Sequence, residues 1–134
     1  MQKKPLVSIL IASFNKEKYV KRCINSCINQ TYNKIEVIFY DDGSNDNSFK
    51  IAKKIKTIKA YKNTKRKKRG VFNTYYQINS YNKAFSKSKG KYILLLDSDD
   101  FFKKNKVEKI VSYFEKNPKS NIIFDLPIYY YSKN

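Results

Sequence analysis

Short apolar runs rich in Ile, Leu and Val recur along the chain, and polar turns separate them. The run at residues 6–12 lies between Pro5 and Ser13, and its length and β-branched residues are typical of a strand buried on both faces. The runs at residues 35–40 and 92–96 both stop at turns that contain aspartate. The pattern predicts five strands, at residues 6–12, 35–40, 57–61, 92–96 and 121–125.

Between these strands, apolar residues return every three or four positions, which is the spacing of an amphipathic helix. Asp46 or Ser44 can cap the second of these helices, and Gly90 is expected in the C-cap position of the third. Pro118 ends the fourth. The predicted helices span residues 16–29, 46–55, 71–89 and 104–116.

The alternation of strand and helix predicts one α/β domain over residues 1–134, a three-layer Rossmann-like sandwich with a mostly parallel sheet and helices on both faces. Ligands bind such sheets beyond the carboxyl ends of the strands, so the polar turns that follow the strands are expected to form a site together. Cys23 and Cys27 share the apolar face of the first helix and are expected to pack in the core. The chain has no histidine, so these thiols cannot build a four-ligand zinc site.

The acidic residues are few and clustered. Only 11 residues are acidic against 29 lysines and arginines, and six of the acids are Asp41, Asp42, Asp46, Asp97, Asp99 and Asp100. Aspartate is common in turns and at helix caps, which would account for Asp46 and Asp100. It accounts less well for Asp97 and Asp99, whose i, i+2 spacing points both side chains to one side of an extended segment. Carboxylates placed in this way repel each other unless a cation such as Mg²⁺ or Mn²⁺ lies between them.

Five sequence blocks carry a resemblance to a known family. They are VSILIASFN at residues 7–15, QTY at 30–32, DDGSND at 41–46, NKAF at 82–85 followed by Gly90, and LDSDD at 96–100. In this order and spacing the chain resembles the family 2 glycosyltransferases of the A-type fold, over roughly residues 5–118. The blocks resemble, in turn, the first strand with its base-binding loop, the segment after the first helix, the acidic turn, the helix that ends in glycine, and the metal motif.

The resemblance implies the nucleotide-diphospho-sugar transferase type of fold and a donor site at the strand ends. Ala12, Ser13 and Phe14 would line the pocket for the nucleotide base, and one carboxylate of the Asp41 and Asp42 pair would accept a hydrogen bond from the base, most often uracil. The residues that would bind the nucleotide are Ala12, Ser13, Phe14, Asn15, Asp41, Asp42, Asp97 and Ser98.

The same resemblance implies a cofactor and a reaction. Asp99 and Asp97 would hold Mn²⁺ or Mg²⁺, and the chain would transfer a sugar with inversion from a nucleoside diphosphate sugar, expected to be a UDP-sugar, to a saccharide or lipid-linked acceptor. An inverting transfer needs a general base. Asp125, at the end of the last predicted strand, is a weak candidate for it. Members of the family usually continue past the metal motif, so the acceptor half is expected to be missing and the chain to be truncated.

The sequence also departs from the family pattern. Ser80 and Tyr81 stand where Ala-Arg usually precedes the helix asparagine, and Ala84 replaces a glycine. The missing arginine removes an expected positive contact to the donor. For so short a chain, an alternative is a catalytically inactive module that binds a nucleotide sugar. A nucleotidyltransferase would also use aspartates on an α/β sheet, but its glycine-rich phosphate loop is absent from a chain with three glycines.

The net charge of +18 favours anionic partners. Residues 62–69 form a basic run that could contact donor phosphates or an anionic membrane, although runs of like charge are more often solvated loops. A basic nucleic-acid-binding protein is the rival interpretation, but it leaves the aspartate clusters unexplained, so no nucleic-acid partner is expected. No apolar run approaches the roughly 20 residues that cross a bilayer, and a signal-peptide cleavage region is lacking. We expect a cytoplasmic protein, with peripheral contact to the inner face of the membrane as a further prediction.

Overall fold

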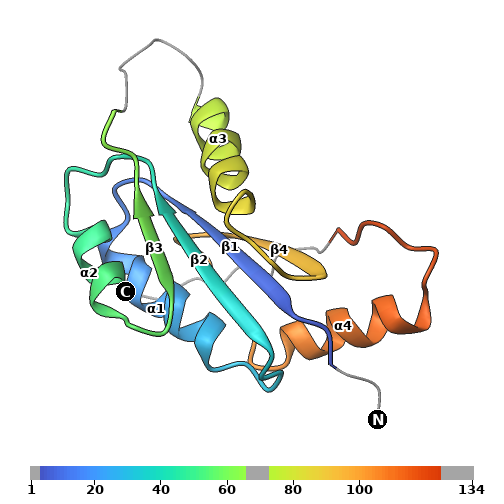
Figure 1. Ribbon diagram of the computed structural model, residues 1–134. Coiled ribbons are helices and arrows are strands. Elements are labelled where there is room, and N and C mark those ends of the chain that lie inside the picture. The colour runs from blue at the N-terminus through green and yellow to red at the C-terminus, as the bar shows by residue number, and fades with distance from the viewer. Residues whose placement is uncertain (1–3, 66–72, 125–134) are drawn as a thin grey trace, which may run out of the picture.

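A computed structural model describes residues 4–65 and 73–124 of the chain. It confirms the α/β class and the order of elements expected from the sequence (Figure 1). The elements are β1 Val7–Ser13, α1 Glu17–Ile28, β2 Ile35–Asp41, α2 Ser48–Lys54, β3 Lys59–Lys62, α3 Asn73–Phe85, β4 Tyr92–Asp97 and α4 Lys106–Lys116.

The described strands form one sheet in the order β3-β2-β1-β4, and each pair is parallel. β1 is central and pairs with β2 on one side and β4 on the other. At its carboxyl end Ser13 pairs with Asp41 and Ala12 pairs with Asp97. The three strands therefore end at one edge of the sheet.

Helices cover both faces of the sheet, which gives the three predicted layers (Figure 1). Side chains alternate along β1, so Val7, Ile9 and Ile11 face the larger core under α1, α2 and α4, while Leu10 packs on the α3 side with Ala84. Every residue of β1 is buried, as expected of a strand enclosed between two helical layers.

The two cysteines behave as core residues. Cys23 and Cys27 are free thiols with no exposed surface, and both pack in the larger core cluster. The prediction from their helical spacing is thereby confirmed.

Helix α2 begins at Ser48, later than its predicted caps. Its N-cap residue is Asn47, with no side-chain cap hydrogen bond, and not the predicted Asp46 or Ser44. Asp46 lies one residue earlier, where its Oδ1 accepts from the Ser48 N–H at 2.9 Å and its Oδ2 accepts from the Glu17 N–H of α1 at 3.0 Å. Glu17 in turn accepts from the Asn47 N–H at 2.8 Å. These contacts join the starts of α1 and α2.

The prediction that Gly90 caps α3 is wrong, because α3 ends at Phe85. Gly90 is needed instead for close packing: its N–H donates to Ser8 Oγ at 2.8 Å, and a Cβ at this position would lie 2.5 Å from the Ser8 nitrogen. Glycine allows the loop before β4 to approach the backbone of β1.

The predicted fifth strand is also wrong for the residues that the structure describes. Residues 121–124 form no strand, and Ile122 and Phe124 are 70% and 94% exposed. β propensity produces a strand only where a partner edge and a core are available. Asp125, the last residue of that prediction, lies outside the described residues.

A partly buried carboxylate, that of Glu36, joins several segments at the opposite end of the sheet. Glu36 Oε1 accepts from Ser8 Oγ and from the Lys89 N–H, both at 2.6 Å, and its Oε2 accepts from Lys59 Nζ at 2.8 Å. Burial alone would raise the pKa of Glu36, but the hydrogen bonds from Lys59, Ser8 and Lys89 outweigh it and lower the pKa.

We predict that Gly90→Ala destabilises the fold by about 1–3 kcal/mol, because the added methyl group collides with Ser8. Urea unfolding monitored by circular dichroism measures the change. Lys89→Ala, at the exposed neighbouring position, is the control and should unfold like the wild type. Equal midpoints for all three proteins would contradict the close approach.

A second prediction concerns acid stability. The pKa of Glu36 is lowered from its ordinary 4.5 in the folded protein. Its contribution to the free energy of unfolding is therefore complete above pH 4.5 and is lost as the pH falls through the folded-state pKa. Glu36→Gln should lower the free energy of unfolding by roughly 2 kcal/mol at pH 7 and by less at acidic pH. Unfolding curves at several pH values test this, with the exposed Glu108→Gln as control. A loss that does not shrink in acid would contradict it.

Candidate functional site

The two acidic turns lie on either side of the carboxyl end of β1. The N–H of Asp42 donates to the Ser13 carbonyl at 2.8 Å, and the N–H of Ser98 donates to the Ala12 carbonyl at 3.2 Å. Each turn thus continues the pairing of its strand with β1. The expectation that distant acidic turns converge at one edge of the sheet is confirmed.

Asp41 shapes its own turn. Its Oδ1 accepts from the N–H groups of Gly43 and Ser44 at 3.0 and 2.8 Å, and its Oδ2 accepts from Ser44 Oγ at 2.5 Å. Gly43 has a φ of 85°, a conformation that glycine adopts without strain. The side chain of Asp41 has no exposed surface, so both of its oxygens serve the turn.

Asp42 faces a different environment from its neighbour. It is 2% exposed, and its Oδ1 accepts from Asn63 Nδ2 at 3.0 Å. Asn63 follows β3, and its N–H donates to the Asp41 carbonyl at 2.7 Å. The end of β3 thereby holds the Asp42 carboxylate beside the carboxyl end of β1.

The loop after β1 is fastened to the loop after β2. Asn15 has a φ of 52°, its N–H donates to Ser44 Oγ at 2.9 Å, and its Oδ1 accepts from the Asn45 N–H at 2.9 Å. Asn15 therefore uses its polar atoms to join the two loops. Phe14 beside it is half-buried, and Ser13 is buried at the strand end.

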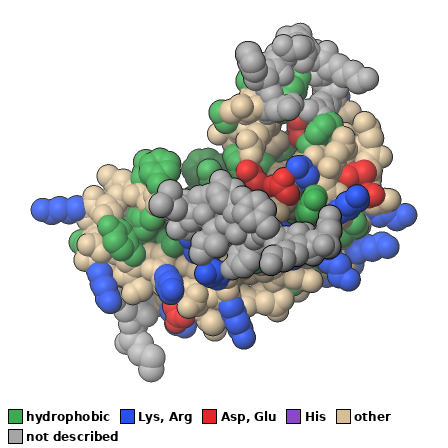
Figure 2. All heavy atoms as spheres, turned by 180° about the vertical axis from the view of Figure 1, so that it is seen from behind, with side chains coloured by type: hydrophobic (Ala, Val, Ile, Leu, Met, Phe, Trp, Pro, Cys, Tyr) green, Lys and Arg blue, Asp and Glu red, His purple; other side chains and the backbone are tan. Residues whose placement is uncertain are grey.

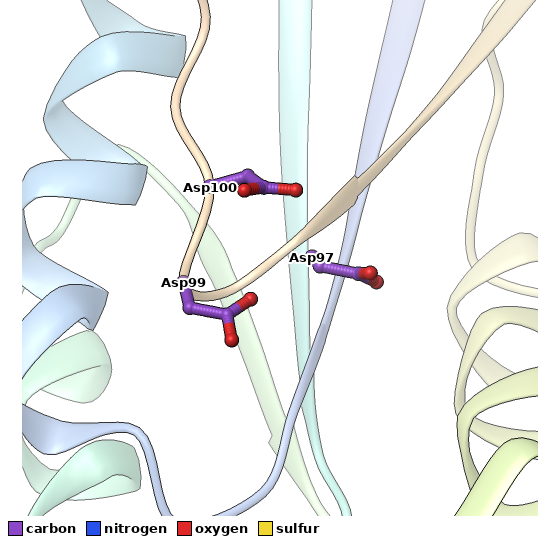
Figure 3. Close-up of side chains that lie close together, drawn as sticks. All are labelled: Asp97, Asp99 and Asp100. Carbon is purple, nitrogen blue, oxygen red and sulfur yellow. The ribbon is translucent and has the colours of Figure 1, made fainter. Parts of the chain in front are cut away.

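Three carboxylates lie close together at the end of β4 and in the turn that follows it. Asp97, Asp99 and Asp100 each offer an oxygen, and these oxygens lie within 4.8 Å of one another (Figure 3). Partial burial, with the charges of Asp99 and Asp97, raises the pKa of Asp100, as expected of crowded carboxylates. Ser98 between them is buried and contributes its backbone to the sheet.

Lys16 partly neutralises this cluster. Its ammonium lies 2.6 Å from Asp99 Oδ2, and the side chains are 40% and 39% exposed. The hydrogen bond with Asp99 raises the pKa of Lys16. Sequence reasoning did not single out this lysine, although its position directly after the Asn15 loop was a usable signal. In Figure 2 most of the acidic side chains that are visible on this face lie in its upper half, among side chains of lysine and arginine.

Helix α3 approaches the cluster from the other face of the sheet. Gln77 Nε2 and Tyr81 OH both donate to Asp97 Oδ1 at 2.5 Å. Burial and the hydrogen bond to Asp97 raise the pKa of the Tyr81 phenol, so it acts as a neutral donor. The sequence marked Tyr81 as a departure from a family pattern and as a packing residue of the helix, but not as a partner of Asp97.

The acidic cluster fits a hard divalent cation. Its donors are carboxylate oxygens on adjoining residues and are accessible to solvent, which are the ligands that Mg²⁺ and Mn²⁺ favour. Asp99 and Asp97, the expected ligands, both belong to it, and Asp100 adds a third carboxylate. The weak candidate for a base, Asp125, lies outside the described residues.

Comparison with known sequences assigns the family. The description "Glycosyl transferase family 2" matches residues 8–134. The chain belongs to this family. An uncharacterized glycosyltransferase of Haemophilus influenzae is 39% identical over 121 residues, which cover 87% of this chain and 35% of that protein. A relative in Escherichia coli, the UDP-Glc:alpha-D-GlcNAc-diphosphoundecaprenol beta-1,3-glucosyltransferase WfaP, is 33% identical over 96% of this chain and 48% of its own length.

Solved structures of other proteins share the fold. The crystal structure of Staphylococcus aureus TarS 1-349 in complex with UDP-GlcNAc superposes with a TM-score of 0.71 at 23% identity. The match covers 84% of this chain and 32% of TarS 1-349. This family member therefore spans about a third to a half of the length of the relatives that it matches here.

The basic stretch is described only at its start. Lys62 Nζ donates to the Ser44 carbonyl at 2.9 Å, so it contacts the acidic turn after β2. Residues 66–69 of the predicted basic run lie outside the described residues. Among the helices that the structure does describe, none has the length and apolarity to cross a membrane.

We predict that Asp41→Asn destabilises the protein by about 1–3 kcal/mol, because an amide supplies one acceptor oxygen where the turn uses two. Thermal unfolding without ligand measures the loss. Asn45→Ala, an exposed change in the same turn, is the matched control. An unfolding temperature in Asp41→Asn that equals the wild-type value would show that the carboxylate does not hold the turn.

Proposed function

We propose that this chain is the donor-binding part of a metal-dependent glycosyltransferase that takes its sugar from a nucleoside diphosphate sugar. The observation that carries the proposal is the position of Asp42 and the Asp97–Asp100 cluster on opposite sides of the β1 end. A nucleotide base bound on one side and a diphosphate on the other would use both groups.

Recognition of the base would fall to Asp42. A nearly buried carboxylate that faces a ring N–H discriminates between bases, because a base without that N–H leaves it unpaired. Asp41 would serve indirectly by holding the turn, while Ala12, Ser13 and Phe14 would line the base pocket. We propose uracil as the base, in keeping with TarS, which has been crystallised with UDP and with UDP-GlcNAc.

The diphosphate end would be held at the acidic cluster. Asp99 and Asp97, with Asp100 beside them, would bind Mn²⁺ or Mg²⁺, which would neutralise charge on the diphosphate as it leaves. A mannosyltransferase of the same fold, from Pyrobaculum calidifontis, is known in complex with GDP-Man and Mn²⁺. Lys16 adds a positive charge at the same place.

The reaction would be an inverting displacement. An acceptor hydroxyl would form a bond to the anomeric carbon, the bond from that carbon to the diphosphate oxygen would break, and a general base would take the hydroxyl proton. The described residues supply the donor side of this reaction. We propose that the acceptor, a saccharide or a lipid-linked saccharide, binds to a part that the relatives carry beyond the matched third to half of their length.

A binding module without transfer is the second candidate, because the described residues form a candidate donor site whereas Asp125, the candidate base, lies outside them. It would bind the donor identically but release no UDP in the presence of acceptors.

The exposed side of α1 would suit peripheral contact with an anionic membrane at its cytoplasmic face, because it carries Lys18, Lys21 and Arg22.

Thermal unfolding with UDP, with and without Mn²⁺, tests the proposed function. At a hundredfold excess over the dissociation constant, UDP with Mn²⁺ should stabilise the chain by about 2.7 kcal/mol. Asp99→Asn should remove the dependence on Mn²⁺, and Asp42→Asn should weaken UDP binding in both conditions. Glu115→Gln, an exposed change on α4, is the control and should respond like the wild type.

Two outcomes would count against the proposal. One is the absence of any UDP-induced shift in the wild type, and the other is an undiminished Mn²⁺ effect in Asp99→Asn. A shift of equal size with every nucleoside diphosphate would contradict the role of Asp42 in particular.

A further inference from the structure

Two residues of α3 hold one oxygen of the acidic cluster. Gln77 and Tyr81 are four residues apart and so lie on one side of the helix, and both donate to Asp97 Oδ1 at 2.5 Å. In Figure 3 the Asp97 carboxylate points away from the backbone of Asp99 and Asp100. Asp97 is thus fixed from the opposite layer of the sandwich to the one that supplies Lys16.

We propose that Tyr81, assisted by Gln77, is a positioning residue that orients Asp97 for a cation-bound diphosphate; this inference rests on the proposed function. Three carboxylates whose oxygens lie within 4.8 Å of one another repel and would turn apart if nothing fixed them. Both α3 donors bind Oδ1, so they fix the orientation of the carboxylate and do not use Oδ2. Asp99 has a different partner, the ammonium of Lys16.

Tyr81 carries more of this effect than Gln77. Tyr81 is half-buried and packs against the small core cluster of Leu10, Ile38 and Ala84, whereas Gln77 is exposed. The tyrosine side chain has only two torsions, and core packing restricts both of them. Because the phenol is partly buried, water competes less for the Asp97 oxygen there than at the exposed Gln77. The hydrogen bond from Tyr81 is therefore the better defined of the two. The donor is also neutral, which keeps the negative charge of the cluster available to a cation.

The test compares Tyr81→Phe with the wild type by calorimetric titration of UDP, at saturating Mn²⁺ and without Mn²⁺. Tyr81→Phe keeps the ring that packs on the core and removes only the hydroxyl donor. We expect about tenfold weaker UDP binding with Mn²⁺ and unchanged binding without it. Gln77→Leu should give a smaller loss with the same dependence on Mn²⁺.

Tyr75→Phe is the matched control, since Tyr75 lies on the same helix with its side chain 59% exposed. It should bind UDP like the wild type in both conditions. Wild-type affinity of Tyr81→Phe at saturating Mn²⁺ would overturn the inference, and so would an equal loss with and without Mn²⁺, which would indicate general damage to the fold. Absence of UDP binding by the wild type would overturn the proposed function as well, so the two failures are distinguishable.

Discussion

The backbone at the carboxyl end of β1 is the feature on which the candidate site depends. The carbonyls of Ser13 and Ala12 accept from the N–H groups of Asp42 and Ser98, one on each side of the strand. Because both neighbouring strands run parallel to β1, their turns emerge at the same edge, and these two hydrogen bonds fix how far each turn extends beyond the sheet. A site assembled from residues more than fifty positions apart thus rests on one buried strand.

Electrostatic compensation at this edge comes from different layers of the molecule. Asp41 is satisfied within its own turn, Asp99 pairs with Lys16 from the β1–α1 loop, and Asp97 receives neutral donors from α3. The protein carries a net charge of +18, yet among the residues that the structure describes only Lys16 forms an ion pair with the cluster. The remaining negative charge is what a divalent cation would neutralise.

The sequence predicted the parts of this architecture that follow from short-range patterns. Apolar runs and acidic turns placed β1, β2 and β4 correctly, and the parallel arrangement followed from the alternation of strand and helix. Side-chain contacts between elements that are distant in sequence were not predictable in this way. The bonds from Tyr81 to Asp97 and from Lys16 to Asp99 join residues 16 and 83 positions apart, and no local pattern records them.

Two errors in the predicted fold have one cause. Gly90 resembled a helix cap because glycine often follows the end of a helix, and residues 121–125 resembled a strand because they contain the apolar run Ile-Ile-Phe. Both patterns describe the local preference of a segment and contain no information on the segments that pack against it. In the structure Gly90 packs closely against Ser8, where a larger residue would collide. Residues 121–124 pair with no strand among the described residues.

The Lys16–Asp99 pair decides how readily a cation could enter the site. Both side chains are about two-fifths exposed, so water screens the pair and it contributes roughly 0.2–1 kcal/mol. A divalent ion that binds two or three carboxylates would gain far more than this, and the released ammonium would stay within reach of bound phosphates. Asp97, by contrast, is held by donors that a cation has no reason to displace. The cluster therefore combines one fixed carboxylate with one whose partner is exchangeable, which would suit the proposed binding and release of an ion together with a nucleotide.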